Sequence, residues 1–318
     1  MCKSRRSGCS PAFFEILCIG KGGGNVKAGR KKLTIPYLIP AVSLYLIFFI
    51  GPAIYGIWIS FNEWSGFTDD MKFVGLKNYE KLMVDPIYWQ SFFNMILILF
   101  VGGIFVFLIG FLFTALMSQG VVAKKAIRAI IFFPQIIAPI ALAVVWNYLY
   151  RFDIGFFNSI LTAIGLNPVN WTGPNNIMMS ALIAIIWYST GFYAIILLAG
   201  VDKIPNTIFE AARVEGASTF KIFTKITLPL IWDVMSIAVI LWGINAIRLF
   251  DFLFAFGGAE PPTRMWNTAM YQFILGFGQR TPIYQLGYSS AIAVTMIFVV
   301  LLFVVTGRKL FKREVYEL

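Results

Sequence analysis

The sequence predicts an all-α membrane protein with six transmembrane helices. Of its 318 residues, 59% are hydrophobic and only 13% are charged, which is too little charge to cover a soluble domain of this size. The apolar residues also cluster into runs of roughly 20, the length at which a helix crosses a bilayer core. The six predicted spans are Pro36–Ser60, Phe92–Ser118, Ala129–Tyr150, Met178–Gly200, Ile231–Phe254 and Leu286–Thr306.

The basic residues predict the orientation of these spans. The formal net charge is +11, and the Lys and Arg residues lie in short segments beside the apolar runs. That distribution is typical of membrane topology, whereas nucleic-acid binding would require a soluble basic face. The N-terminal segment, the loops after the second and fourth spans and the C-terminal segment carry 19 of these residues, against six in the other loops. The positive-inside rule therefore predicts that both termini are cytoplasmic.

This topology divides the chain into three regions. We expect a basic cytoplasmic tail over residues 1–35, a transmembrane domain over residues 36–310 and a cytoplasmic C-terminus over residues 311–318. Within the transmembrane domain, residues 201–230 form a long cytoplasmic loop. Membrane lipid is thus an expected partner, and nucleic acid is not.

Residues that could carry covalent chemistry are scarce. The chain has no His, which excludes His-based metal sites and His general-base catalysis. Cys2, Cys9 and Cys18 all lie in the N-terminal tail, and their spacing matches no zinc pattern. A nucleotide-binding P-loop is also missing from the sequence. We therefore expect no catalytic residues, no metal site and no cofactor bound by this chain.

The loop over 201–230 contains helix start and stop signals. Thr207 and Glu210 have the T-x-x-E spacing of a capping box, which predicts a helix start. Gly216 is suited to the left-handed residue that ends a helix, and Ser218 can cap a second short helix. Pro229 then marks the entry into the fifth span. Taken alone, these two helices fit equally well an amphipathic element that lies on the membrane surface, with Glu210 serving only as a cap.

The same loop resembles the signature of a known family. Glu210-Ala211-Ala212, then Gly216, and then Ile226 followed by Leu228-Pro229 have the spacing found in permease subunits of binding-protein-dependent ABC importers. In that family this segment is the coupling helix, which docks into a cleft on the cytoplasmic ATPase. The resemblance assigns ATPase coupling to Glu210, Ala211, Ala212, Gly216, Ala217, Phe220, Leu228 and Pro229.

Other parts of the chain extend this resemblance. Phe73–Tyr79, Asp85-Pro86, Phe133-Pro134 and Phe250-Asp251 resemble segments of the first permease subunits of maltose-type and glycerol-3-phosphate-type importers. The resemblance implies the type I ABC-importer permease fold in a cell membrane and a sugar or sugar-like substrate. It also implies three partners: a second homologous permease, two ATP-binding subunits that bind ATP and Mg, and an extracytoplasmic solute-binding protein.

Polar side chains within the spans are candidates for a substrate path. Amide groups and aromatic rings suit sugars, which offer hydroxyls and weakly apolar ring faces. Ordinary hydrogen bonds between helices would explain the same residues. Arg248 and Asp251 could pair at i, i+3 on one helix face, and we favour a position near the outer interface for that pair over direct substrate contact. The candidates are Gln135, Asn147, Tyr188, Ser189, Phe192, Trp242, Asn245, Arg248 and Asp251.

Three classes of function remain to be compared. The leading hypothesis is a transport subunit of an ATP-driven importer, powered by a partner. A stand-alone secondary transporter or channel is the alternative, and it would need intramembrane acidic residues, of which only Asp233 and Asp251 qualify. A membrane-embedded enzyme is disfavoured because the spans hold no nucleophile–base pair. Pro134 and Pro139 predict a kink in the third span, whichever function holds.

Overall fold

The computed structural model describes residues 38–117, 123–278 and 284–312. These residues form two units that divide between Gly56 and Ile57, and each unit is described separately. The N-terminal tail predicted over residues 1–35, with its three cysteines, lies outside the described residues. So do Pro36, Ser118 and all but the first two residues of the predicted C-terminal segment.

The first unit is helical from Leu38. A 22-residue apolar helix runs over Leu38–Ile59 and continues from the first unit into the start of the second. It includes a π-helical turn, η2 (Leu46–Ile50), followed by α2 (Gly51–Ile59). This helix is long and apolar enough to cross a membrane, in agreement with the first predicted span.

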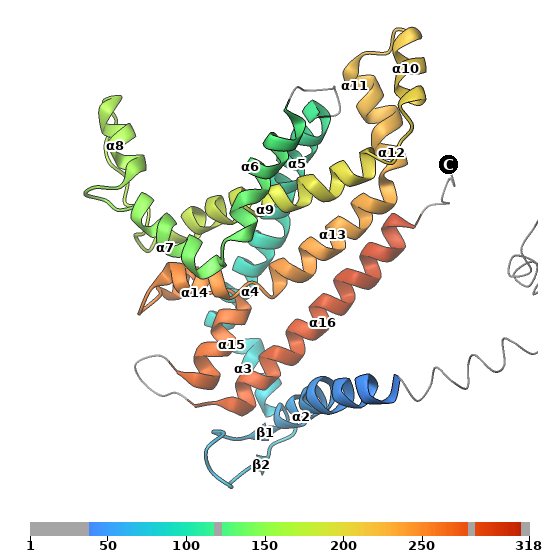
Figure 1. Ribbon diagram of the computed structural model, residues 1–318. Coiled ribbons are helices and arrows are strands. Elements are labelled where there is room, and N and C mark those ends of the chain that lie inside the picture. Colours follow the sequence, from blue (N-terminus) through green and yellow to red (C-terminus); the bar gives the residue numbers. More distant parts are fainter. Residues whose placement is uncertain (1–37, 118–122, 279–283, 313–318) are drawn as a thin grey trace, which may run out of the picture. The chain divides into compact units, whose positions relative to one another are not determined.

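The second unit is helical apart from one small sheet (Figure 1). Its first half contains β1 (Asn62–Glu63), β2 (Lys72–Phe73), α3 (Lys77–Val84), α4 (Pro86–Leu97), η3 (Ile98–Gly102), α5 (Gly103–Met117), α6 (Lys124–Ile136), α7 (Pro139–Leu149) and α8 (Phe156–Ala163). Its second half contains α9 (Ile177–Val201), α10 (Asn206–Val214), α11 (Thr219–Ile222), η4 (Phe223–Thr227), α12 (Leu228–Leu230), α13 (Trp232–Ile247), α14 (Asp251–Gly257), η5 (Thr263–Met265), α15 (Thr268–Phe277) and α16 (Leu286–Phe311).

Six candidate spans can be recognised in the described part of the chain. Four are long helices: Leu38–Ile59, Pro86–Met117, Ile177–Val201 and Leu286–Phe311. The other two are bent pairs, each counted as one span: Lys124–Ile136 with Pro139–Leu149, and Thr219–Leu230 with Trp232–Ile247. The predicted number of spans is therefore confirmed, although two of the six are not straight helices.

The third predicted span, Ala129–Tyr150, is broken. Helices α6 and α7 meet at an angle of 96°. Pro139 is the first residue of α7, and Ala138 before it has the extended ψ of 133° that a following proline imposes. The predicted break at Pro139 is thus confirmed. Pro134 lies inside α6, which continues past it to Ile136, so the sharp bend of the third span is at Pro139 and not at Pro134.

The fifth predicted span, Ile231–Phe254, ends too late. Helix α13 stops at Ile247, and a separate helix, α14, begins at Asp251. Arg248 caps α13 and Asp251 opens α14, so the two residues do not share a helix face. The start of the span also differs, because residues Thr219–Leu230 meet α13 at 75°.

Helix α9 lies at the centre of the second unit. It packs against α5, α6 and α13, while α16 packs against α13 and α15 (Figure 1). Ala184 and Leu197 on α9, Val106 on α5 and Ala238 on α13 are fully buried. Small residues at these contacts let the helices approach closely, which compensates for the weak hydrophobic drive between helices in lipid.

Asp85 joins three elements at one end of the second unit. Its carboxylate caps α4 by accepting hydrogen bonds from the backbone of Ile87 (2.9 Å) and Tyr88 (3.3 Å). The same carboxylate accepts hydrogen bonds from the hydroxyls of Tyr271 on α15 (2.5 Å) and Tyr288 on α16 (2.6 Å). Partial burial alone would raise the pKa of Asp85, but these four hydrogen bonds together lower it below the ordinary value of 3.8.

We predict that Asp85→Asn lowers the free energy of unfolding by about 1–3 kcal/mol at neutral pH, because two tyrosine hydroxyls lose a charged acceptor. A group with a lowered folded-state pKa stabilises the protein above its unfolded pKa, and this contribution is lost as the pH falls through the folded-state pKa. Thermal unfolding of the purified chain should therefore separate the two proteins at neutral pH and bring them together as the pH falls below 3.8.

Glu80→Gln is the matched control, because it removes an exposed carboxylate from the neighbouring helix α3. Equal losses of stability in the two variants would show that the Asp85 network does not join the helices.

Candidate functional site

Eight of the nine candidate path residues line one cavity of about 320 Å³ in the second unit, called the membrane cavity below. The cavity lies between α6, α9, α13 and the start of α14, so it is built from segments that are far apart in the sequence. The eight residues are Gln135, Tyr188, Ser189, Phe192, Trp242, Asn245, Arg248 and Asp251.

Helix geometry explains why these residues meet. Tyr188, Ser189 and Phe192 lie within one turn of α9, and Trp242 and Asn245 lie three residues apart on α13, so each set shares a face. Gln135 comes from the last turn of α6, next to the break before α7. The remaining two residues belong to the break between α13 and α14.

Trp242 is held in place by the helix opposite it. Its indole Nε1 donates a 2.8 Å hydrogen bond to the carbonyl of Leu99, in the π-helical turn η3. This approach requires a glycine at position 103, because a Cβ atom there would lie 2.6 Å from the same Nε1. The indole therefore forms a fixed wall of the cavity and not a mobile side chain.

A residue that the sequence analysis missed completes this wall. Tyr193 is buried, lines the cavity and accepts a 3.3 Å hydrogen bond on its hydroxyl from Nδ2 of Asn245. Its position one residue after Phe192 is the signal that could have identified it. Pro139 and Phe250 also line the cavity, from the two helix breaks.

Asn147 does not reach the cavity. Its Nδ2 donates a 2.8 Å hydrogen bond to the carbonyl of Phe256, which joins α7 to α14. Asn147 thus makes an ordinary hydrogen bond between helices, which was the alternative explanation for the polar residues in the spans. Arg248 and Asp251 both line the cavity, but no ion pair joins them within residues 38–117, 123–278 and 284–312.

The cavity can hold a small polar solute. Its described lining combines one cation, one anion, two amides, several hydroxyls and aromatic rings. The charges of Arg248 and Asp251 are opposite, so together they do not favour an ion of either sign. Hydroxyl-rich solutes with apolar ring faces match such a lining.

The second candidate region is the loop between α9 and α13. Helix α10 ends at Val214, and Gly216 has the left-handed φ of +74° that was predicted for the turn. The backbone N–H of Ala217 returns to the carbonyl of Ala212 (3.0 Å), which closes the end of the helix. Ser218 caps α11 as predicted, by accepting a hydrogen bond from the backbone of Lys221 (3.4 Å).

The predicted capping box at Thr207 and Glu210 is wrong. Helix α10 begins at Asn206 and follows Pro205, and no side chain caps it. Thr207 lies inside the helix, where its own backbone is already helical, so its hydroxyl cannot serve as the N-cap. The fixed φ of Pro205 is the local signal that sets the helix start.

The predicted coupling residues differ in exposure. Glu210, Ala211, Gly216 and Pro229 are exposed, Ala217 and Leu228 are half-buried, and Ala212 is buried against its own chain. Phe220 is 76% exposed, and so is an apolar residue that was not predicted, Val214, at 90%. The turn thus presents two apolar side chains outward, which is unusual for a surface that meets only water.

Both regions fall within the match to a known protein family. Residues 107–313 match the family model described as the inner membrane component of binding-protein-dependent transport systems. The chain belongs to this family. The matched range covers both the loop between α9 and α13 and the helices that form the membrane cavity.

The permease resembles curated relatives over almost its whole length. It is 32% identical to the trehalose/maltose transport system permease protein MalF of Thermococcus litoralis, covering 91% of this chain and 97% of the relative. It is 28% identical to the diacetylchitobiose uptake system permease protein NgcF of Streptomyces coelicolor, and this match covers 87% of this chain and 84% of the relative.

A solved structure gives the fold of the permease. A chain of a bacterial ABC transporter involved in the import of the acidic polysaccharide alginate superimposes with a TM-score of 0.77 at 20% identity. The match covers 90% of this chain and 96% of the other. The permease therefore has the type I ABC-importer fold, as the sequence predicted.

An ion-pair cluster links the two regions of the permease. Asp202, just before the loop, accepts hydrogen bonds from Lys124 (3.0 Å) and Arg128 (2.6 Å) at the start of α6. Partial burial alone would raise the pKa of Asp202, but the hydrogen bonds and charges of Arg128 and Lys124 lower it. The other end of α6 carries Gln135, which lines the membrane cavity, so a single helix connects the loop with this cavity.

Proposed function

We propose that this permease imports a sugar or sugar-like polyol and is driven by ATP hydrolysis on a partner subunit. The observation that carries the proposal is the cavity lined by amides, hydroxyls and aromatic rings, which α6 links to an exposed loop. The names of relatives that carry trehalose, maltose and diacetylchitobiose support the same class of substrate.

The proposal implies a set of partners. A second homologous permease completes the path, two ATP-binding subunits hold ATP and Mg, and a solute-binding protein delivers the substrate outside. The exposed Val214 and Phe220 support docking of an ATP-binding subunit on the loop, because a partner surface would cover their apolar area. Movement of that partner would reach Gln135 through the Asp202 ion pairs and α6.

The proposed orientation has both termini and the loop over 201–230 in the cytoplasm, since the basic residues gather on that side. Cysteines introduced one at a time can test it in intact cells. An impermeant thiol reagent should label positions 70 and 260 and should not label position 215. Labelling of position 215 would reverse the orientation.

A stand-alone secondary transporter or channel is the second candidate. One observation favours it, because Asp251 lines the membrane cavity and could couple the solute to an ion. Arg248 lines the same cavity and opposes the binding of a cation there. Co-purification with an ATP-binding subunit separates the two candidates.

The function predicts ATP-dependent uptake of a saccharide by the reconstituted complex. Vesicles that contain this permease, its partner permease, the ATP-binding subunits and the binding protein should accumulate maltose, trehalose or diacetylchitobiose only with ATP. Uptake that persists without the ATP-binding subunits would favour the stand-alone transporter. Uptake of amino acids or metal ions, with no saccharide carried, would contradict the substrate class.

The coupling assignment predicts a graded loss at Gly216. No atom lies within 4 Å of a Cβ added there, so backbone strain is the main effect of a substitution. Gly216→Ala should cost about 1–2 kcal/mol and weaken uptake. Gly216→Pro cannot adopt φ of +74° and also removes the backbone N–H that bonds to Arg213, so it should abolish uptake and release the ATP-binding subunits.

Two further variants make this test specific. Gly165→Pro introduces the same change at φ +80° after α8, away from the loop, and should leave the ATP-binding subunits bound. Val214→Asp changes an exposed side chain without affecting the core and should weaken retention of those subunits. If Gly216→Pro and Val214→Asp both keep uptake and ATPase retention, the loop is only a membrane-surface element.

A further inference from the structure

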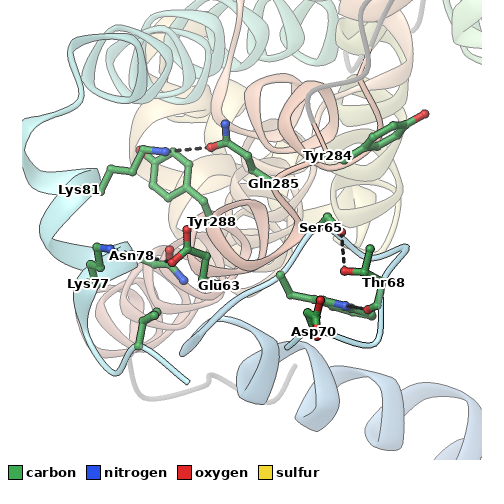
Figure 2. A pocket seen from close by; sticks show the side chains of 12 residues that line it. Glu63, Ser65, Thr68, Asp70, Lys77, Asn78, Lys81, Tyr284, Gln285 and Tyr288 are labelled. Carbon is green, nitrogen blue, oxygen red and sulfur yellow. Dashed lines mark hydrogen bonds and ion pairs between the residues drawn. The ribbon is translucent and has the colours of Figure 1, made fainter. Parts of the chain in front are cut away.

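A second, larger cavity lies in the second unit of the permease. It has a volume of about 680 Å³ and shares no lining residue with the membrane cavity. Its walls come from β1 and the segment after it, from α3 and from the start of α16 (Figure 2). In the proposed orientation these elements lie on the outer side, where solute arrives.

The charges of this outer cavity cancel. Its described lining contains two carboxylates, Glu63 and Asp70, and two ammonium groups, Lys77 and Lys81. An anion would meet the two carboxylates and a cation the two ammonium groups, so neither is selected by net charge. A neutral solute with both donors and acceptors can use all four groups, since its hydroxyls donate to carboxylates and accept from ammonium groups.

Several polar groups of the outer cavity are held by the protein. Lys81 donates a 2.8 Å hydrogen bond to Oε1 of Gln285 and lies 4.3 Å from the ring centre of Tyr288 (Figure 2). Tyr288 is itself fixed by its hydrogen bond to Asp85. A lining that is ordered before the solute arrives reduces the entropy lost on binding.

Asn78 provides the most specific feature. It is only 9% exposed, and its Nδ2 donates 2.9 Å hydrogen bonds to the carbonyls of both Ser60 and Asn62. Among the described residues, no donor reaches the side-chain oxygen of Asn78. This oxygen lines the cavity without a protein donor and is accessible there, so it is suited to accept a hydrogen bond from a ligand.

Aromatic rings border the same space. Trp64 is half-buried in the lining, and its Nε1 donates to the carbonyl of Thr68 (2.6 Å), which orders the segment that carries it. Tyr284 is 37% exposed and packs against Phe67 with ring centres 4.4 Å apart. Exposed ring faces of this kind contact the apolar faces of sugar rings.

We propose that the outer cavity is a binding site for a neutral saccharide, separate from the membrane cavity. The saccharide would pass from it to the membrane cavity during import. The site is concave and has the volume of a small-ligand pocket, which favours a saccharide over the surface of a protein partner. This inference rests on the proposed saccharide transport.

Photolabelling of the assembled transporter tests the inference. The full complex, in lipid nanodiscs without the solute-binding protein, would be exposed to diazirine-tagged maltose, trehalose and diacetylchitobiose and mapped by mass spectrometry. We expect labelled peptides from residues 63–81 or 284–288, and excess untagged saccharide should suppress this label.

Paired variants assign the label to a cavity. Trp64→Ala with Tyr284→Ala should reduce the outer label about fivefold or more and leave the label near Gln135 and Asn245 unchanged. Gln135→Ala with Asn245→Ala should reduce the label in the membrane cavity and leave the outer label unchanged. Thermal unfolding of the complex checks that the outer variant is folded, and Trp64→Phe, which keeps a ring, should retain most of the outer label.

The following results would overturn the inference. Labelling confined to the membrane cavity, or an outer label that free saccharide does not suppress, excludes a saccharide site. The outer variant, Trp64→Ala with Tyr284→Ala, could instead weaken binding of the solute-binding protein and keep its saccharide label. That result would show that the outer cavity is a docking surface for this protein. Saccharide uptake with no outer label refutes only this inference, whereas the absence of both uptake and label refutes the proposed function as well.

Discussion

The fold depends on one constraint: within lipid, every backbone N–H and C=O must find a partner inside the protein. Continuous helices satisfy it, but this chain interrupts its helices at several points, among them between α6 and α7 and between α13 and α14. Both interruptions border the membrane cavity, through Gln135 and Pro139 at the first and Arg248 to Asp251 at the second. Irregular backbone within a membrane protein is tolerated where it lines a cavity, which agrees with the position of the membrane cavity at these two helix breaks.

Amide side chains donate hydrogen bonds to backbone carbonyls at both ends of α14. Asn267, which is fully buried, donates its Nδ2 to the carbonyl of Leu249 and uses its Oδ1 to cap α15 (3.0 Å to the N–H of Met270). Asn147 does the same for the carbonyl of Phe256, near the end of α14. Each amide therefore supplies a donor to a carbonyl at a helix end, and Asn147 has this structural role instead of lining the membrane cavity.

Hydropathy and residue spacing predicted the spans and most of the membrane cavity. Six apolar runs set the number of spans, and polar residues within them met at one cavity because burying them elsewhere in lipid is unfavourable. The break at Pro139 could be predicted from the sequence, because proline disfavours a helical conformation of the residue before it. The break at 248–250 was not, because Arg248-Leu249-Phe250-Asp251 contains no proline or glycine and the helix ends there for tertiary reasons. The capping box at Thr207 was wrong although its spacing to Glu210 matches the motif, because the helix already begins at Asn206, directly after Pro205.

The open space around Gly216 has a consequence for how this loop can evolve. Because no atom would contact a side chain there, no neighbouring residue can change to accommodate or to reject one. Selection at this position then acts on a single backbone angle, independently of any partner surface that covers the loop. Positions such as Val214, whose side chain points away from its own chain, are free to diversify with that surface. The turn can thus keep its shape while the exposed residues around it change.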